Sequence, residues 1–323
     1  MRHAAAVAFA VGLMAGVGLS AQAQTYPNKP VRMIISCPAG CLPDILGRAI
    51  NQSVSQAFGQ PVVVDNRAGA NGNIAMDLCT KSPADGYTIC MVSNVAMSLN
   101  PFAYAKLPFD PQGLVPVVHV SNLDQAIAVH PSVPVKNVRE LLKLARSKPG
   151  TVTWASLGSG STSHLYLEWM SAKTGARFLH VPYKGSPQAM TALTANEVML
   201  TVLTPGLFKP HVDAGKVRVI GVVSGDKRSP LLPDVPTLDE QGFDLDFRNW
   251  FALYFPKGTP AEPVQRWNSE VNKVLADKAF TNKYFIPSGV TPTGGTPEQL
   301  AAIAKRSRQT GAELAKMAKL RFD

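Results

Sequence analysis

Short β-forming runs alternate with amphipathic helical stretches along most of the chain, and this alternation limits the possible folds more than any other feature. Val31-Arg-Met-Ile-Ile35 favours a strand, and a loop rich in Pro and Gly follows it over residues 38–43. Residues 44–58 then carry apolar side chains on one side at helical spacing, with Asp44 in the first turn, where a negative charge suits the helix dipole. A repeated strand–loop–helix order predicts an α/β fold in which helices flank the sheets.

The same order continues and then restarts near the middle of the chain. We predict further strands at 61–64, 87–92, 126–129, 151–155, 178–181, 198–202, 217–223 and 250–255, a helix ending near 79, and helices at 138–147, 164–173, 263–275 and 297–319. A chain of 323 residues is longer than one core usually serves, so two similar lobes are expected. The chain would cross between them near Val129 and again near Asn249. The first lobe then comprises 24–128 and 249–323, and the second comprises 129–248.

The N-terminus has the pattern of a secretory signal peptide. Arg2 and His3 are followed by an apolar run over 4–19 and by the small-x-small triplet Ala21-Gln-Ala23. We therefore expect residues 1–23 to be removed and the mature protein to be soluble and periplasmic. A membrane anchor is the alternative, but the apolar run is short for a bilayer span and no later stretch is longer.

The charge and the cysteines of the chain indicate which kinds of ligand and partner it can bind. The formal net charge is +10, but the basic residues are scattered and form no arginine-rich run with interleaved aromatics, so we expect no nucleic acid partner. A weak positive field favours anionic solutes. The four cysteines allow three complete pairings in an oxidising compartment, of which Cys79–Cys90 is favoured because it joins a helix end to the next strand. Cys37 and Cys41 have no second ligand pair, so no metal and no cofactor are expected.

Three loops rich in small residues follow predicted strands, which is where open parallel sheets bind ligands. They are Pro38-Ala39-Gly40-Cys41, Ser93-Asn94 and the Ser/Gly segment 156–163. The first amides of a helix have no partner within it, and the dipole favours an anion there. Small residues let a carboxylate approach these amides, so two opposed loops could hold a dicarboxylate. The alternative is that such loops are only turns and helix caps.

Catalytic interpretations have weaker support. Gly158-Ser-Gly-Ser161 is neither the nucleophile elbow of hydrolases nor a phosphate-binding loop. A thiol-dependent hydrolase or isomerase would need Cys37 or Cys41 beside His164 or His180 in space, and this remains a third hypothesis. Such an enzyme would lose turnover on mutation of either cysteine to serine.

The chain resembles the Bug-type, TctC-like solute-binding proteins of tripartite tricarboxylate transport systems over nearly all of its length from Tyr26 onward. The segments that carry the resemblance are Tyr26-Pro-Asn-Lys-Pro30, Pro38-Ala-Gly40, Val62-Val-Val-Asp-Asn-Arg67, Gly69-Ala-Asn-Gly-Asn73, Asp85-Gly-Tyr-Thr88, Asn100-Pro101, Leu107-Pro-Phe-Asp-Pro111, His130-Pro-Ser132, His164-Leu165, His180-Val-Pro-Tyr-Lys-Gly185, Leu232-Pro-Asp-Val-Pro-Thr237 and Gly258-Thr-Pro260. Each segment is modest alone, but their order is very specific.

The resemblance implies a two-lobed periplasmic binding protein of the type II, "Venus flytrap" kind, with a mixed sheet flanked by helices in each lobe and a cleft for a carboxylated solute. Such proteins do no chemistry and hand the solute to membrane permease subunits; we expect a monomer. Some members report to sensor proteins, so a ligand-sensing adaptor is the alternative. Carried onto this chain, the family's carboxylate grip points to Pro38, Ala39, Gly40, Asp44, Ser93, Ser156, Gly160, Ser161 and Ser163, with Tyr183 and Thr204 in the same cleft.

The first loop departs from the family pattern. Cys37 stands where an aromatic or apolar residue is usual, Cys41 replaces a second Gly, and Pro43 replaces a Ser or Thr. Pro43 removes one N–H donor and one hydroxyl, although Pro is acceptable in the first turn of a helix. We therefore expect weaker grip on polar solutes and a preference for a less polar, aromatic carboxylate.

Overall fold

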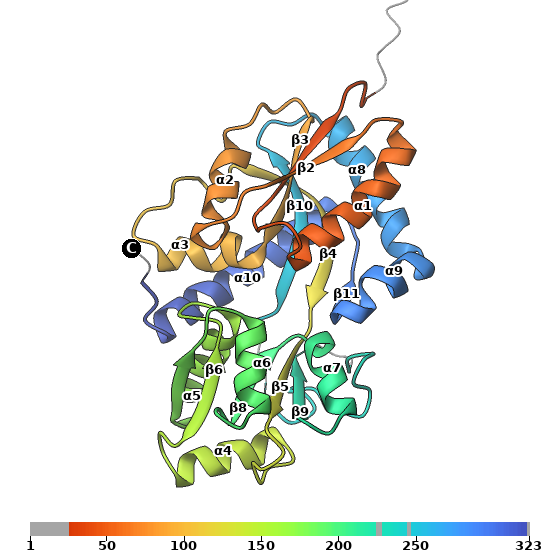
Figure 1. Cartoon of the computed structure of the whole chain (residues 1–323). Helices are drawn as coiled ribbons and strands as arrows, with labels where there is room; N and C mark the ends of the chain where they lie inside the picture. Colours follow the sequence, from red (N-terminus) through yellow and green to blue (C-terminus); the bar gives the residue numbers. More distant parts are fainter. Residues whose placement is uncertain (1–25, 224–227, 244–246, 322–323) are drawn as a thin grey trace, which may run out of the picture.

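The chain folds into two lobes, each built around one mixed β-sheet (Figure 1). The computed structural model describes residues 26–223, 228–243 and 247–321. The signal peptide expected at 1–23 lies outside these residues. Within the part that is described, none of the helices combines the length and apolarity that a membrane span requires.

The first lobe contains a six-stranded sheet in the order β11-β4-β10-β3-β1-β2. Its strands are β1 (Val31–Ile35), β2 (Val62–Asn66), β3 (Thr88–Ser93), β4 (Leu114–Leu123), β10 (Asn249–Pro256) and β11 (Val290–Pro292). β1 runs parallel to β2 and β3, whereas β10 is antiparallel to both β3 and β4. Strands from both ends of the chain therefore share one sheet.

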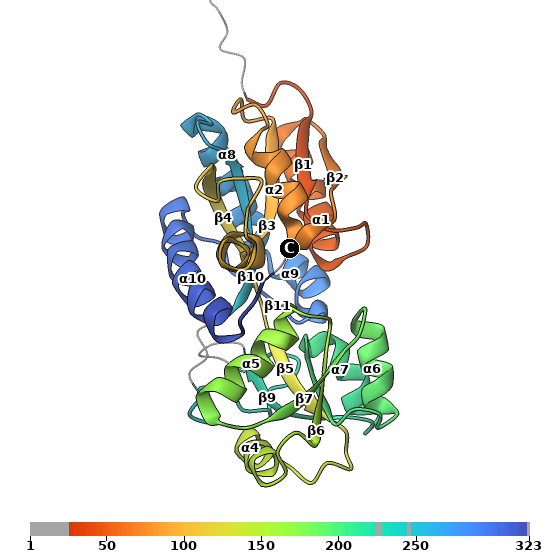
Figure 2. The same ribbon diagram turned by 90° about the vertical axis from the view of Figure 1, so that its left-hand side faces the viewer.

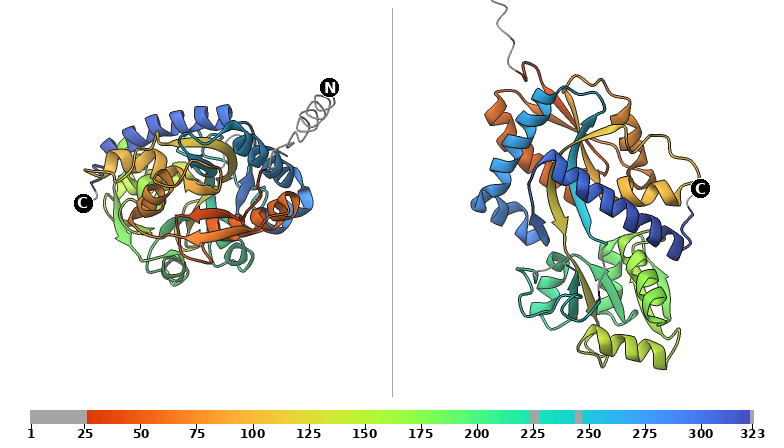
Figure 3. Two further views of the ribbon diagram at one scale, coloured as in Figure 1. Left: turned by 90° about the horizontal axis from the view of Figure 1, so that it is seen from above. Right: turned by 180° about the vertical axis from the view of Figure 1, so that it is seen from behind.

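Helices cover both faces of this sheet (Figures 2 and 3). They are α1 (Leu42–Phe58), α2 (Asn73–Thr80), α3 (Asn100–Ala103), α8 (Ala261–Ala276), α9 (Lys278–Tyr284) and α10 (Pro297–Met317), with short turns η1 (Ala70–Gly72), η2 (Val95–Leu99, a π-helix) and η3 (Ile286–Ser288). Successive side chains of a strand point to opposite faces. Accordingly, Met33 and Ile35 pack in the core under α1 and α8, and Ile34 packs in the core under α2 and α10.

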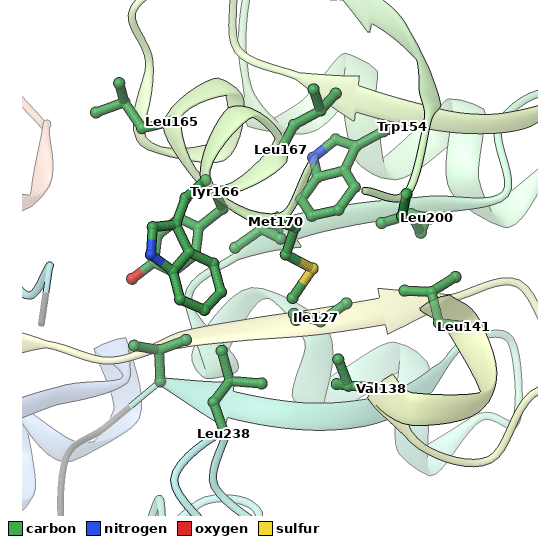
Figure 4. Packing of buried hydrophobic residues seen from close by; sticks show 14 of the residues in the cluster. Ile127, Val138, Leu141, Trp154, Leu165, Tyr166, Leu167, Met170, Leu200 and Leu238 are labelled. Atoms are coloured by element: carbon green, nitrogen blue, oxygen red, sulfur yellow. The ribbon is translucent and has the colours of Figure 1, made fainter. Parts of the chain in front are cut away.

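The second lobe contains a five-stranded sheet in the order β7-β6-β8-β5-β9. Its elements are β5 (Gln125–Val129), β6 (Val152–Ser156), β7 (Phe178–Pro182), β8 (Leu200–Leu203), β9 (Arg218–Val223), α4 (Val138–Ser147), α5 (Thr162–Thr174), α6 (Ser186–Thr194) and α7 (Pro205–Asp213). Its largest core lies around the fully buried Trp154, where Met170 of α5 and Leu141 of α4 meet the sheet (Figure 4).

The chain leaves the first sheet at Asp124, between β4 and β5, and re-enters it at Asn249, where β10 begins. The strand expected at 126–129 pairs in the second sheet, so the change of sheet falls a few residues before the expected crossing near Val129. The sequence pattern also missed β4. Pro116 interrupts its run, and the β4–β10 register shifts close to that proline, so the strand has no regular alternation to detect.

Two disulfides close local loops. Cys79–Cys90 joins the end of α2 to β3, which confirms the pairing that the sequence favours. Cys37–Cys41 closes the loop between β1 and α1.

Candidate functional site

A cavity of about 650 Å³ lies between the lobes. Its walls are formed by Ser36, Cys37, Pro38, Pro43, Ala68, Gly69, Ala70, Asn71, Gly72, Ser93, Val95, Leu123, Gln125, Leu157, Gly160, Ser161, Thr162, Ser163, Ser186, Val202, Leu203, Thr204, Leu207, Asn249 and Phe251. These residues come from both sheets and from the two chain crossings, so a solute in the cavity would touch both lobes.

The first-lobe wall is built where three parallel strands end. Ser36 and Pro38 follow β1, the loop 68–72 follows β2, and Ser93 ends β3. The carboxyl ends of parallel strands meet at one edge of a sheet, so the three loops converge there. Gly69 has a φ of 123°, a conformation that L-residues with a side chain rarely adopt, which allows the loop after β2 its sharp path.

Asp44 organises the loop between β1 and α1 from inside. Its buried carboxylate accepts 2.9 Å hydrogen bonds from the Gly40 amide, Arg48 Nε and Asn66 Nδ2. Burial alone would raise the pKa of Asp44, but the hydrogen bonds from Arg48, Gly40 and Asn66 outweigh it and hold this pKa below its ordinary value. The Gly40 amide, which the sequence assigned to the solute, is therefore engaged by Asp44.

The second-lobe wall is the loop 157–163 and the first turn of α5. Ser161 caps the helix: its Oγ accepts from the His164 amide at 3.4 Å and donates to the Gly158 carbonyl at 2.6 Å. Ser163 Oγ accepts from the Leu157 amide at 3.0 Å. These bonds leave the first-turn amides of Thr162 and Ser163, which have no partner within a helix, beside the cavity.

The starts of three more helices also border the cavity. Thr204 immediately precedes α7, Ser186 begins α6, and Gly72 immediately precedes α2; all three line the cavity. Among the described residues that line it, none is Asp, Glu, Lys, Arg or His. The helix starts therefore contribute a positive field to a site without a charged side chain, and an anion suits such a field.

The two chain crossings supply polar and apolar groups. Asn249 Nδ2 donates to Thr162 Oγ1 at 2.7 Å, whereas Asn249 Oδ1 is buried and has no hydrogen-bond partner among the described residues. Leu123 and Phe251 place apolar surface nearby. The site thus combines amide donors with hydrophobic walls, as small-molecule sites commonly do.

The structure brings half of the sequence-predicted residues to the cavity. Pro38, Ser93, Gly160, Ser161, Ser163 and Thr204 line it, and Ala39, Gly40, Cys41, Asp44, Ser156 and Tyr183 do not. Ser156 is fully buried behind the loop, where its Oγ meets His180 Nε2 at 2.5 Å. The partly buried Tyr183 packs at the edge of a core cluster in the second lobe.

Sequence reasoning missed the loop 68–72 and the crossing residues Leu123, Gln125, Asn249 and Phe251. The loop follows β2, so the rule that selected Pro38 and Ser93 could have selected it as well. The crossing residues had no such signal, because β4 was not predicted and the crossings were placed only approximately.

A cleft between two lobes, with the connecting strands beside it and helix starts on both walls, defines a two-lobed solute-binding protein. The sequence matches the tripartite tricarboxylate transporter family receptors over residues 46–318. It is 34% identical to BugT of Bordetella pertussis, over 93% of this chain and 95% of that protein. The chain therefore belongs to this family, whose members are periplasmic receptors.

Solved structures agree with this assignment. An R. palustris protein solved with adipate is 31% identical, with a TM-score of 0.79, over 92% of this chain and all of that one. A TctC solute-binding protein from Polaromonas, solved without ligand, is 25% identical with a TM-score of 0.80, over 90% of this chain and 99% of that one. This chain is accordingly a transport receptor and not an enzyme. Cys37 and Cys41 are joined to each other, so neither is a free thiol as the hydrolase hypothesis required.

Proposed function

We propose that the mature protein captures a small organic carboxylate in the cleft and delivers it to the membrane permease subunits of a tripartite transporter. One observation carries the proposal: helix starts from both lobes converge on a cavity whose described lining has no charged side chain. An adipate-bound relative of similar structure supports a carboxylate as the solute.

The interaction energies are sufficient for useful affinity. A hydrogen bond from an amide to a charged acceptor contributes about 1.5–3 kcal/mol, and one helix start adds about 0.3–1 kcal/mol. Micromolar affinity needs about 8 kcal/mol net. Several such donors from the two walls would together supply an interaction energy of this size. Contacts to both lobes would also bias the hinge toward closure, because a ligand shifts only the state that it binds better.

The solute's body is proposed to be apolar, and aromatic carboxylates are the preferred class. Cys37 and Pro43, two departures from the family pattern, both line the cavity, as do Val202, Leu203 and Phe251. These side chains favour a hydrocarbon or an aromatic ring between the acid groups. Calorimetry with benzoate, terephthalate and adipate against aspartate and citrate tests this preference; tighter binding of aspartate or citrate would contradict it.

A matched pair of variants tests whether the solute is an anion. Thr204 precedes α7 at the cavity wall and makes no capping hydrogen bond with its side chain. Thr204→Asn and Thr204→Asp are both good helix caps and differ mainly in charge. We expect the Asn variant to bind the best carboxylate of the panel and the Asp variant to lose at least about tenfold in affinity, or about 1.4 kcal/mol. Equal binding by both variants would rule out an anionic solute at this wall.

Export and assembly are part of the same proposal. Cleavage after Ala23 should give a periplasmic protein that begins at Gln24, and intact-mass measurement of the periplasmic fraction would show it. A mass that retains residues 1–23 would contradict the signal peptide. Light scattering should give the mass of a monomer with and without solute.

A further inference from the structure

Two histidines are stacked behind the loop that forms the second-lobe wall. His164 lies in the first turn of α5 and His180 in β7, with ring centroids 4.4 Å apart and planes inclined by 22°. His164 is 9% exposed, and neither ring lines the cavity. Both histidines fall in segments that carry the family resemblance, although neither ring touches the cavity.

His164 holds the loop through its Nδ1 atom. The Gly160 amide donates to His164 Nδ1 at 3.1 Å, so this nitrogen must carry a lone pair and not a proton. The proton of the neutral ring then lies on Nε2, which is 3.4 Å from Glu168 Oε1. Gly160 lines the cavity and has a φ of 77°, so its amide direction sets the path of the loop.

His180 supports the same loop through Ser156. Its Nε2 lies 2.5 Å from Ser156 Oγ, and that oxygen accepts from the Gly158 amide at 3.1 Å. His164 thus binds the Gly160 amide directly, and His180 reaches the Gly158 amide of the same loop through Ser156 Oγ. Loop geometry and imidazole protonation are therefore coupled.

Protonation would break this arrangement. An N–H at His164 Nδ1 would face the N–H of Gly160, donor against donor, and a charge on both stacked rings would add repulsion. The charged group beside the pair is Glu168 of α5, and Lys319, beyond the end of α10, acts in turn on Glu168. Burial lowers the pKa of His164, and burial together with the neighbouring His164 lowers the pKa of His180, so both rings are neutral near pH 7. Burial raises the pKa of Glu168, which weakens its pull on a proton at His164.

We propose that His164 is a positioning residue of the solute site: its neutral imidazole orients the Gly160 amide and thereby the loop 157–163, and acid releases the solute by protonating it. This inference deepens the proposed function, since it concerns the regulation of the same cleft. His180 and Ser156 are the supporting members of the device.

The first experiment needs no solute. Amide shifts of Gly158 and Gly160 in the mature protein are followed by NMR from pH 8 to pH 4.5, beside the ring signals of His164. In the wild type we expect the chemical shift of the Gly160 amide to change with pH together with the signals of the His164 ring. In His164→Asn the shift should stay constant, because Oδ1 of the asparagine can replace Nδ1 as acceptor and does not titrate. The proposal is overturned if the chemical shift of the Gly160 amide does not change as the ring titrates, or if it changes equally in both proteins.

The second experiment measures adipate affinity over the same pH range in both proteins. Protonation of adipate itself affects both equally, so the ratio of the two dissociation constants isolates His164. We expect this ratio to rise by up to about tenfold per pH unit below the pKa of His164. A constant ratio overturns the role in release.

A third variant separates positioning from titration. His164→Gln places its amide near the Nε2 position and leaves Gly160 without its acceptor, so adipate binding at pH 7.5 should weaken severalfold relative to His164→Asn, and equal binding by the two variants overturns the positioning role. If neither adipate nor the aromatic carboxylates of the panel bind either protein at any pH, the proposed solute class fails, and the solute-free titration still decides the role of His164.

Discussion

Asn249 Nδ2 and Thr162 Oγ1 lie 2.7 Å apart and join the start of β10 to the first turn of α5 within the wall of the cleft. β10 belongs to the first sheet and α5 to the second lobe, so this hydrogen bond connects the two parts that must move for the cleft to open. Because both residues line the cavity, a solute that orders them would stabilise the same arrangement of the lobes.

The first prediction concerns this contact. Asn249→Ala and Thr162→Val should each weaken solute binding by about threefold to tenfold, because a net hydrogen bond contributes about 0.5–1.5 kcal/mol. The double variant should bind no worse than the weaker single variant, since the same bond is lost in each. Calorimetry on the four proteins of this cycle measures the coupling, and fully additive losses would show that the two side chains act independently.

The second prediction concerns the close approach of the lobes at Gly206. Gly206 lies in α7 of the second lobe and Pro287 in η3 of the first. A Cβ added at Gly206 would lie only 2.5 Å from the carbonyl oxygen of Pro287. Gly206→Ala should therefore push the lobes apart, increase the radius of gyration in solution scattering with solute present, and weaken binding. Lys209→Ala, which removes only an exposed ion pair of the same helix, should leave both quantities unchanged. Wild-type scattering from the Gly206→Ala variant would contradict the expectation.

The third prediction concerns Asp124, the residue at the change of sheet. It is 2% exposed, and burial raises its pKa to about 7. The hydrogen bond from Thr291 and the charge of Arg248 lower this pKa, but burial outweighs them. The folded protein therefore keeps this proton up to about pH 7, whereas the unfolded chain loses it near pH 4. Between these values unfolding releases a proton, so the free energy of unfolding contributed by Asp124 falls as the pH rises.

Asp124→Asn should remove this loss. We expect the free energy of unfolding of the variant, taken relative to that of the wild type, to rise by roughly 2–4 kcal/mol from pH 4 to pH 8, with most of the rise below pH 7. Denaturant unfolding at both pH values measures it, and the difference between variant and wild type cancels the contribution of buried His119. A pH-independent difference would show that Asp124 does not titrate in this window.

The fourth prediction concerns the packing of α10. Gly311 lies against η2, where an added Cβ would overlap the carbonyl oxygen of Ser98. Gly311→Ala should destabilise the protein by about 1–3 kcal/mol, since neither backbone can yield easily. Gln309→Ala, on the exposed side of the same helix, should change stability by less than about 0.5 kcal/mol. Thermal unfolding compares the two, and equal melting temperatures would contradict the close packing.

Local pattern was enough to predict most of the elements that build the lobes. Val31–Ile35 and Val138–Ser147 begin and end as the pattern indicates, because apolar periodicity and turn residues act over a few neighbours. The ordered motifs were also enough to indicate the family, and the family indicates transport without catalysis. The Ser/Gly loops could be placed at the cleft in advance, since strand ends of one sheet edge must converge.

Tertiary structure alone decided which of these residues face the solute. Asp44 and Ser156 have the right chemistry and the right loops, yet the first is held by Arg48 and Asn66 and the second by His180, partners that the fold brings together. Asn249 meets Thr162 only because β10 returns beside the second lobe after a long excursion of the chain. A side chain's direction is set by the strongest partner within reach, and that partner is known only once distant segments are packed.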